Sequence, residues 1–188
     1  MLTPSFTPFP VLETPRLILR KPVEADVPNI FLMRSDPEVM KYIPRPLATS
    51  HEDVKNLLTM IADFTEKNER INWAIEWKET GDAIGMIGYV NIKPEHNRGE
   101  VGYSLTRSWH RKGIMREALR AVLQYGFETI GCHSIEAIID AENVPSGNLL
   151  EGIGFRKEAH FIQDFLHNNE YRNSIHYGML HSEFKSRN

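Results

Sequence analysis

The chain has 188 residues, a length that suits one domain built around one hydrophobic core. With 41% hydrophobic and 25% charged residues, it has the composition of an ordinary globular protein, which excludes the disordered, collagen-like and coiled-coil classes. Its net charge of -3 gives no general attraction to nucleic acids, so we expect no specific nucleic-acid binding.

The start of the chain predicts an extended arm. Three prolines lie within MLTPSFTPFP, and proline both fixes φ and biases the preceding residue away from helix. This segment has neither a basic start nor a long apolar stretch, so we expect no signal peptide, and no apolar run in the chain reaches the length of a membrane span. We therefore assign residues 1–12 to the arm, 13–184 to a single domain and 185–188 to a C-terminal tail.

The first half of the domain predicts two helices and then a meander of strands. A short apolar run at 16–21 predicts a strand, and the apolar spacing over 24–34 predicts a helix. Ser50 can cap a second helix, in which apolar residues recur every few positions as far as Phe64. The period then changes to alternation, which predicts three antiparallel strands at 72–78, 83–93 and 100–105.

The second half predicts alternating helices and strands. Apolar residues recur at helical spacing from Gly113 to Ile130, the clearest helix of the chain, and Gly131 follows as its cap. A strand at 134–139, a short helix at 145–151 and a last strand at 171–180 complete the pattern. This order indicates the α/β class.

A basic turn that contains glycine, RSWHRKGIMREA, precedes the clearest helix. The first N–H groups of a helix have no intrahelical partner and the helix dipole is positive there, so a phosphate group is stabilised at this place. Gly113 removes a side chain from the approach, and Arg111 and Lys112 add positive charge. Taken alone, a glycine at a helix start is more often a simple cap.

Four segments together resemble the GNAT acetyltransferases, and within that family the Rim-type ribosomal-protein N-terminal acetyltransferases. They are ETPRLILRKPVEADV, then GEVGYSL with WHRKGIMREAL, and finally IDAENVPSGNLLEGIGF, in the order and spacing of the family. The resemblance spans residues 14–182. It implies an α/β (α+β) fold with a central, mostly antiparallel mixed sheet of about seven strands, helices on both faces, and two strands splayed apart.

The resemblance also implies that acetyl-CoA is the acetyl donor. The residues that would bind it are Val101, Tyr103, Leu105, His110, Arg111, Lys112, Gly113, Ile114, Met115, Asn143 and Ser146. The sequence departs from the family motif at His110, where the family has glutamine or arginine, and at Met115, where it has glycine or alanine. A methionine whose side chain points into the core still presents its backbone amide. Helix capping is an alternative explanation for Asn143 and Ser146.

Transfer of an acetyl group to an amine needs a base for the ammonium and a hydrogen-bond donor for the departing thiolate. Many family members use a tyrosine as the acid, at a position that Leu150 occupies here, and leucine cannot donate a proton. The resemblance gives the donor role to Ser146. Glu100 is the first candidate for the base, although it could equally be an exposed partner of Arg98, and the resemblance makes Asp164 the second candidate.

The acceptor that the resemblance implies is a primary amine, with the α-amino group of a (ribosomal) protein N-terminus as the first choice. A small amine such as an antibiotic, a polyamine or an amino acid is the alternative, because one fold serves many acceptors. A non-catalytic module that senses acetyl-CoA is a third reading, which Leu150 favours. Four aromatic residues could either line an acceptor pocket or belong to the core: Tyr42, Trp73, Trp109 and Tyr171.

Cysteine and histidine usage completes the expectations. Cys132 is alone and cannot form an internal disulfide, and no histidine or cysteine pattern matches a metal site. We expect no metal, no membrane association and a cytoplasmic location. The sequence leaves open whether the protein is a monomer or a homodimer.

Overall fold

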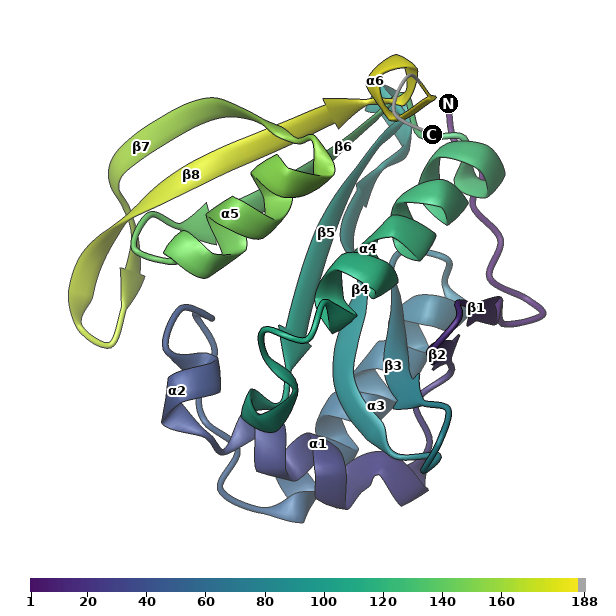
Figure 1. Cartoon of the computed structure of the whole chain (residues 1–188), viewed down its shortest axis with the longest axis vertical. Helices are drawn as coiled ribbons and strands as arrows, with labels where there is room; N and C mark the ends of the chain where they lie inside the picture. The colour runs from purple at the N-terminus through teal and green to yellow at the C-terminus, as the bar shows by residue number, and fades with distance from the viewer. Residues whose placement is uncertain (186–188) are drawn as a thin grey trace.

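The computed structural model describes residues 1–185, which form one eight-stranded sheet with helices packed on both faces (Figure 1). The strand order is β1-β2-β3-β4-β5-β6-β8-β7; the β5–β6 pair is parallel and the other neighbours are antiparallel. The strands are β1 (Leu12–Glu13), β2 (Leu17–Arg20), β3 (Ile71–Trp77), β4 (Ala83–Lys93), β5 (Arg98–Leu105), β6 (Ser134–Asp140), β7 (Arg156–His167) and β8 (Glu170–Leu180). This mixed, mostly antiparallel sheet confirms the predicted fold class.

The helical elements follow the predicted order along the chain. They are η1 (Glu24–Asp26), α1 (Val27–Arg34), α2 (Pro37–Met40), α3 (His51–Glu66), η2 (Pro94–His96), η3 (Arg107–Trp109), α4 (Ile114–Gln124), η4 (Tyr125–Ile130), α5 (Val144–Ile153) and α6 (His181–Lys185). The cap predicted for α3 is present, because the Ser50 hydroxyl accepts from Asp53 N at 3.3 Å and the Asp53 carboxylate accepts from Ser50 N at 3.0 Å. These reciprocal bonds satisfy N–H groups at the start of α3.

The sheet has eight strands where about seven were predicted, and the additional strand β1 begins inside the predicted arm. Two residues are too few for alternation to be visible in a sequence. The arm packs on the domain: Leu2 and Phe6 are buried, and Trp73 Nε1 donates to the Pro10 carbonyl at 2.7 Å. Within the predicted tail, Lys185 ends α6, and residues 186–188 lie outside the described part of the chain.

Each face of the sheet carries its own apolar cluster. The larger one includes Tyr89 of β4, Val101 of β5 and Leu119 of α4, and it also contains buried residues of α5. The smaller one joins Ile30 of α1 to Met86 of β4, together with buried residues of α3. The helices α4 and α5 therefore lie on one face of the sheet, and α1 and α3 lie on the other.

The helix predicted from Gly113 to Ile130 is α-helical only as far as Gln124, and its last six residues form a π-helix. The cause is a contact from the sheet. Tyr89 Oη donates to the Val122 carbonyl at 2.9 Å and so occupies a carbonyl that would otherwise accept a bond within the helix. A Cβ atom on Gly126 would lie 1.7 Å from Tyr89 Oη. Insertion of a side chain into the hydrogen-bond ladder widens a helix in this way.

We expect Gly126→Ala to destabilise the protein by about 3 kcal/mol, because the added methyl group must displace a fully buried tyrosine. Urea unfolding followed by circular dichroism measures this change. Gln124→Ala, at an exposed position of the same helix, is the matched control and should change the free energy of unfolding by less than about 0.5 kcal/mol. Equal stability of Gly126→Ala and the wild type would show that the tyrosine hydroxyl does not occupy this space.

The feature of the fold that positions the site is the point where β5 and β6 part. The two strands pair in parallel over only three residues each, and the last pair is Glu100 and Glu136. Beyond it, β5 continues to Leu105 along β4, and β6 continues to Asp140 along β8. Each strand therefore stays paired with its outer neighbour while the pairing between β5 and β6 ends, so a gap opens in the middle of the sheet.

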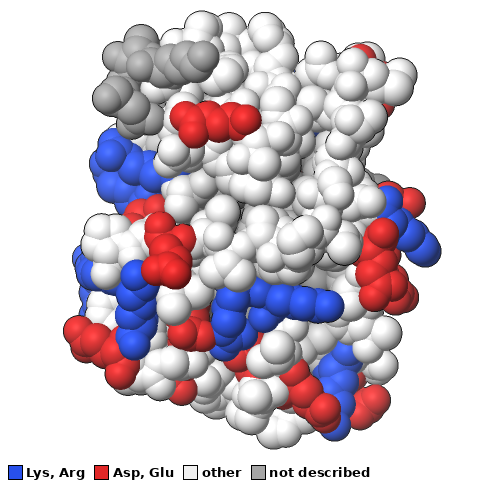
Figure 2. All heavy atoms as spheres, turned by 90° about the vertical axis from the view of Figure 1, so that its right-hand side faces the viewer, with Lys and Arg blue, Asp and Glu red and all other residues white. Residues whose placement is uncertain are grey.

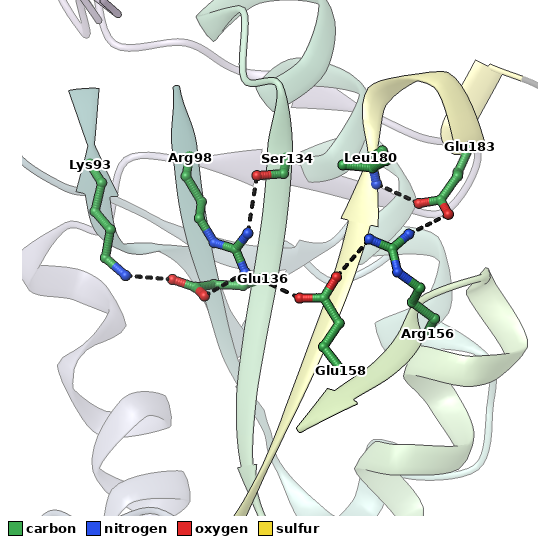
Figure 3. Close-up of polar contacts among 8 residues, drawn as sticks. All are labelled: Lys93, Arg98, Ser134, Glu136, Arg156, Glu158, Leu180 and Glu183. Carbon is green, nitrogen blue, oxygen red and sulfur yellow. Dashed lines mark hydrogen bonds and ion pairs between the residues drawn. The ribbon is translucent and has the colours of Figure 1, made fainter. Parts of the chain in front are cut away.

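Charged side chains tie the strands together at the closed end of this gap (Figure 3). Glu136 of β6 is 5% exposed, and its carboxylate contacts Lys93 Nζ of β4 at 2.9 Å and Arg98 Nη2 of β5 at 2.8 Å. Burial alone would raise the pKa of Glu136, but the hydrogen bonds from Arg98 and Lys93 outweigh it and hold that pKa below its ordinary value. The network continues to Arg156, Glu158 and Glu183. It fixes the place where the strands begin to diverge.

Candidate active site

A cavity of about 400 Å³ lies in the gap between β5 and β6 and is lined by residues from both faces of the sheet. Its walls are the diverging strands, the start of α5 and the segment that runs from the end of α1 to the loop before α3. The residues that line it with polar or charged side chains are Arg34, Tyr42, Arg45, Asn72, Glu100, Tyr103, Ser104, Asn143 and Ser146. The structure thus brings together residues that are more than 100 positions apart in the chain.

Two hydroxyl groups meet at the side of the cavity formed by α5. Ser146 Oγ lies 2.7 Å from Tyr103 Oη, and Ser146 is 8% exposed. Asn143 is the N-cap of α5, and its side chain accepts from Ser146 N at 3.3 Å, which fixes the first turn of the helix. The capping role considered for Asn143 is therefore present, and it positions Ser146 at the cavity.

Burial raises the pKa of Tyr103 to about 12, although the hydrogen bond with Ser146 offsets part of the shift. The phenol is thus protonated at neutral pH and can donate. Leu150, at the position of the family's tyrosine, is completely buried in the core. The sequence assigned Tyr103 only to the strand that holds the cofactor. The alternation of β5 could have indicated more, because it places residue 103 on the same face as Val101 and Leu105, the face that α4 and α5 cover.

Glu100 lines the cavity at the point where the strands part. Burial raises the pKa of its carboxyl above the ordinary value, and the negative charge of Glu136 raises it further. A hydrogen bond from Asn91 and the charge of Lys93 act in the opposite direction without cancelling the shift. The alternative of an exposed ion pair with Arg98 is wrong, because Arg98 pairs with Glu136 and Glu158 and Glu100 is half-buried (Figure 3).

The structure does not bring Asp164 to the cavity. It lies exposed on β7, where its carboxylate accepts from Ser174 N at 2.9 Å and from Ser174 Oγ at 2.6 Å. These bonds pin an irregular part of the β7–β8 hairpin, where the pairing register shifts between Phe161 and Phe165. Asp164 is therefore placed as a structural residue of the hairpin.

The basic turn forms the N-terminus of α4, as the sequence predicts. Gly113 is the N-cap with φ of 75° and Arg111 has φ of 61°, so two left-handed residues lie close together in the turn. Such conformations make successive N–H groups converge into an anion-binding concavity. Met115 packs against the core, and His110 Nε2 donates to the Leu105 carbonyl at 2.8 Å. The two residues that depart from the family motif therefore stabilise the turn from inside.

Arg16 on the neighbouring segment holds this turn in place. Its Nη1 donates to the Lys112 carbonyl at 3.1 Å, and its Nε lies 2.7 Å from Glu117 Oε2 in the first turn of α4. Glu117 also accepts from Arg16 N at 2.9 Å and from Thr14 Oγ1 at 2.6 Å. These contacts tie the entry of the chain into the sheet to the start of α4.

We expect Arg16→Gln to raise the KM for acetyl-CoA about five-fold with little change in kcat, because it removes the bonds that hold the turn where the pyrophosphate is predicted to bind. Steady-state kinetics at a saturating amine measure the effect. Lys78→Gln is the matched control, because Lys78 forms an exposed ion pair with Glu13 on the adjoining strand segment. An unchanged KM in Arg16→Gln would show that the turn keeps its shape without this residue.

Of the four aromatic residues left open by the sequence, three take one of the two roles and Tyr171 takes neither. Tyr42 lines the cavity, whereas Trp73 is completely buried in the core. Trp109 packs against Trp77 with ring centroids 4.9 Å apart, and Lys112 Nζ lies 4.7 Å from the centre of the Trp109 ring. Tyr171 is 68% exposed near the tip of the β7–β8 hairpin.

Within residues 1–185, no group of three or more His, Cys, Asp or Glu side chains could hold a metal ion. No helix in the same range is long and apolar enough to cross a membrane.

Residues 16–156 match the Acetyltransferase (GNAT) domain family, so the chain belongs to the GNAT acetyltransferases. It is 33% identical over 161 residues to the uncharacterized N-acetyltransferase YoaA of Bacillus subtilis, which covers 86% of this chain and 90% of YoaA. It is 36% identical over 154 residues to the N-acetyltransferase p20 of Bacillus licheniformis, with 82% and 86% covered. A GNAT acetyltransferase structure from Bacillus anthracis superposes with a TM-score of 0.82 at 29% identity and covers 93% of this chain and 100% of that one.

Relatives whose names state an acceptor match only part of the chain. The ribosomal protein uS5-alanine N-acetyltransferase of Escherichia coli is 31% identical over 110 residues, 58% of this chain and 56% of its own length. The spermidine N(1)-acetyltransferase of the same species is 27% identical over 95 residues, 50% and 51% of the two chains. The protein is thus an N-acetyltransferase of a family that uses acetyl-CoA, with an amine as acceptor.

Proposed function

We propose that this protein transfers an acetyl group from acetyl-CoA directly to a primary amine, with the α-amino group of a protein N-terminus as the acceptor. One observation carries the proposal: a single cavity, in the gap between β5 and β6, contains both a half-buried carboxylate and a pair of hydrogen-bonded hydroxyls. These are the two kinds of group that the reaction needs, a base and a donor to the leaving thiolate.

The site fits acetyl-CoA at both ends. Along β5, residues 101–105 are free of β6, so their backbone groups on that edge are available to the amides of a pantetheine arm. The N-terminus of α4, with its converging N–H groups and with Arg111 and Lys112 beside it, suits a pyrophosphate. At the start of α5, Asn143 and Ser146 complete the site.

In the proposed reaction Glu100 accepts a proton from the ammonium group of the acceptor, directly or through water, and the free amine attacks the thioester carbonyl. The new C–N bond forms, the C–S bond breaks, and the thiolate departs toward Ser146. The Ser146 hydroxyl donates to that sulfur while Tyr103 Oη donates to Ser146 Oγ at 2.7 Å, which orients the serine hydrogen toward the cavity. The attacking nitrogen loses its second proton as the C–S bond breaks, and the thiolate takes up a proton, so the products are the acetamide and the free thiol of CoA.

The choice of a protein N-terminus rests on the Rim-type resemblance and on the similarity to the uS5-alanine acetyltransferase. The partial match to a spermidine acetyltransferase is the observation that favours a small amine instead. The presence of Glu100, Tyr103 and Ser146 around one cavity argues against a module that only senses acetyl-CoA.

Release of thiol from acetyl-CoA, with mass detection of the products, tests the proposal. The acceptors are peptides that begin with Ala, Ser or Met, spermidine, free amino acids and aminoglycosides. Acetylation at a peptide α-amine supports the full proposal. Acetylation of small amines alone overturns the acceptor, and tight acetyl-CoA binding without turnover on any amine overturns the reaction.

A further inference from the structure

The end of the cavity away from α4 and α5 is positively charged, and acetyl transfer itself does not require a positive charge there. It lies on the face of the sheet covered by α1 and α3, with apolar walls from Ile43, Leu57 and Ile61. Two guanidinium groups line the same end, those of Arg34 and Arg45. Since the cofactor-binding elements are on the opposite face, this end is the place for the acceptor.

The backbone brings the two arginines together. Arg34 is the last residue of α1, and its carbonyl accepts from Ala48 N at 3.0 Å. This bond draws the loop that carries Arg45 against the end of the helix. Arg34 is half-buried, and its pKa is lowered first by burial and then by the positive charge of Arg45. The two cations thus repel each other, and water only partly solvates Arg34, whereas Arg45 is exposed.

Within residues 1–185, neither guanidinium has a carboxylate at ion-pair distance. Four other half-buried arginines each have one or more acidic partners, namely Arg16, Arg20, Arg98 and Arg172, and a fifth, Arg70, lies over the Phe64 ring. Acidic and basic side chains are interspersed on the surface as well, as the face in Figure 2 shows. A partly buried cation without a partner costs stability unless a ligand supplies the opposite charge.

Glu100 lies elsewhere along the same cavity, and the charges that act on it come from Glu136, Lys93 and His176. The cavity therefore presents a carboxylate where the amine must react and two cations further out. This order of charges matches a molecule that has an ammonium group at one end and an anionic group a short distance away. A polyamine would instead place its second ammonium group beside the arginines, where like charges repel.

We propose that the acceptor amine carries a carboxylate, which Arg34 and Arg45 bind while the amine reaches Glu100. The inference rests on the proposed function and narrows its substrate class. The carboxylate can come from an acidic side chain near the N-terminus of a peptide or from the α-carboxylate of a free amino acid. Guanidinium groups suit this ligand because their planar N–H donors match the two oxygens of a carboxylate.

Matched acceptors test the charge preference. Peptides that begin Ala-Asp are compared with peptides that begin Ala-Asn, and free alanine is compared with alaninamide, with spermidine as the cationic acceptor. In one of the two pairs we expect kcat/KM to be about 10-fold higher for the acceptor with the carboxylate, since a hydrogen bond to a charged group contributes about this factor. We expect the lowest kcat/KM for spermidine. The pair that shows the preference identifies the source of the carboxylate.

Variants assign the preference to the two arginines. Arg34→Gln and Arg45→Gln should each reduce the ratio of kcat/KM between charged and neutral acceptors several-fold. Lys41→Gln should keep the wild-type ratio, because Lys41 lies in the same loop but does not line the cavity. A ratio of one in the wild type, or an unchanged ratio in both arginine variants, overturns the inference.

A binding measurement separates this inference from the proposed function. Calorimetry with CoA present records the binding of N-acetyl-alanyl-aspartate and N-acetyl-alanyl-asparagine, and of N-acetylalanine and its amide. Preference for the charged member that Arg34→Gln abolishes supports the inference even where no amine is acetylated, which would overturn the proposed function alone. Turnover without any charge preference in rates or binding overturns the inference and leaves the proposed function standing.

Discussion

Replacing Ser146 with alanine is expected to lower kcat about 100-fold while the affinity for acetyl-CoA stays within about two-fold of the wild type. The hydroxyl is 2.7 Å from Tyr103 Oη and lies at the cavity in the first turn of α5. Its loss leaves the departing thiolate without a hydrogen bond, which raises the barrier to C–S cleavage. The ground state keeps its contacts with the turn before α4, so binding of acetyl-CoA changes little.

Tyr103→Phe should produce a similar loss of turnover, because the serine hydrogen then has no fixed direction. The double variant should be about as slow as either single variant, since residues that act as one unit are not additive. Tyr177→Phe is the control. Burial raises the pKa of Tyr177 to about 12 as well, but its hydroxyl donates to Glu151 Oε1 and does not line the cavity. If Ser146→Ala kept wild-type turnover, Ser146 would have no part in the reaction.

The sequence predicted the elements around this site well, because each rests on local periodicity. Spacing of apolar residues over 113–130 gave the helix, and the structure places the glycine turn, the basis of the predicted anion site, at the N-terminus of α4. The π-helical end was not predictable, because it depends on a contact with Tyr89, which is 33 positions away. The two-residue strand β1 was too short to show a period.

The residues of the candidate site also fall into those that the sequence could predict and those that it could not. Ser146 was proposed from the family resemblance and Glu100 as a carboxylate on the strand expected to splay from its neighbour, and both line the cavity. Arg34, Arg45 and the side chain of Tyr103 were missed as a set, because nothing in the sequence shows that the end of α1 faces the gap between β5 and β6. Asp164 was proposed from the family resemblance, and it lies outside the cavity in the irregular part of the β7–β8 pairing.

The pH dependence of turnover tests the second catalytic group. We expect Glu100→Gln to lower kcat about 100-fold and to remove the ascending limb of the rate at acid pH, since the amide cannot accept the proton of the ammonium. In the wild type this limb should lie above the ordinary range of a glutamate, because burial and the charge of Glu136 raise the pKa of Glu100. Rates are measured with one acceptor throughout, so that the titration of its own amine is the same in every variant.

Glu136→Gln gives the sharper test, because it changes the pKa of Glu100 without touching that residue. Removal of the neighbouring negative charge favours the ionised form of Glu100, and Lys93 and Arg98 lose their shared partner at the same time (Figure 3). Both effects lower the pKa of Glu100, so the ascending limb should move to lower pH. Glu158→Gln is the control within the same network, because Glu158 pairs with Arg98 and Arg156 and is not among the charges that act on Glu100. A limb that stays in place in Glu136→Gln, or one that persists in Glu100→Gln, would show that another group receives the proton.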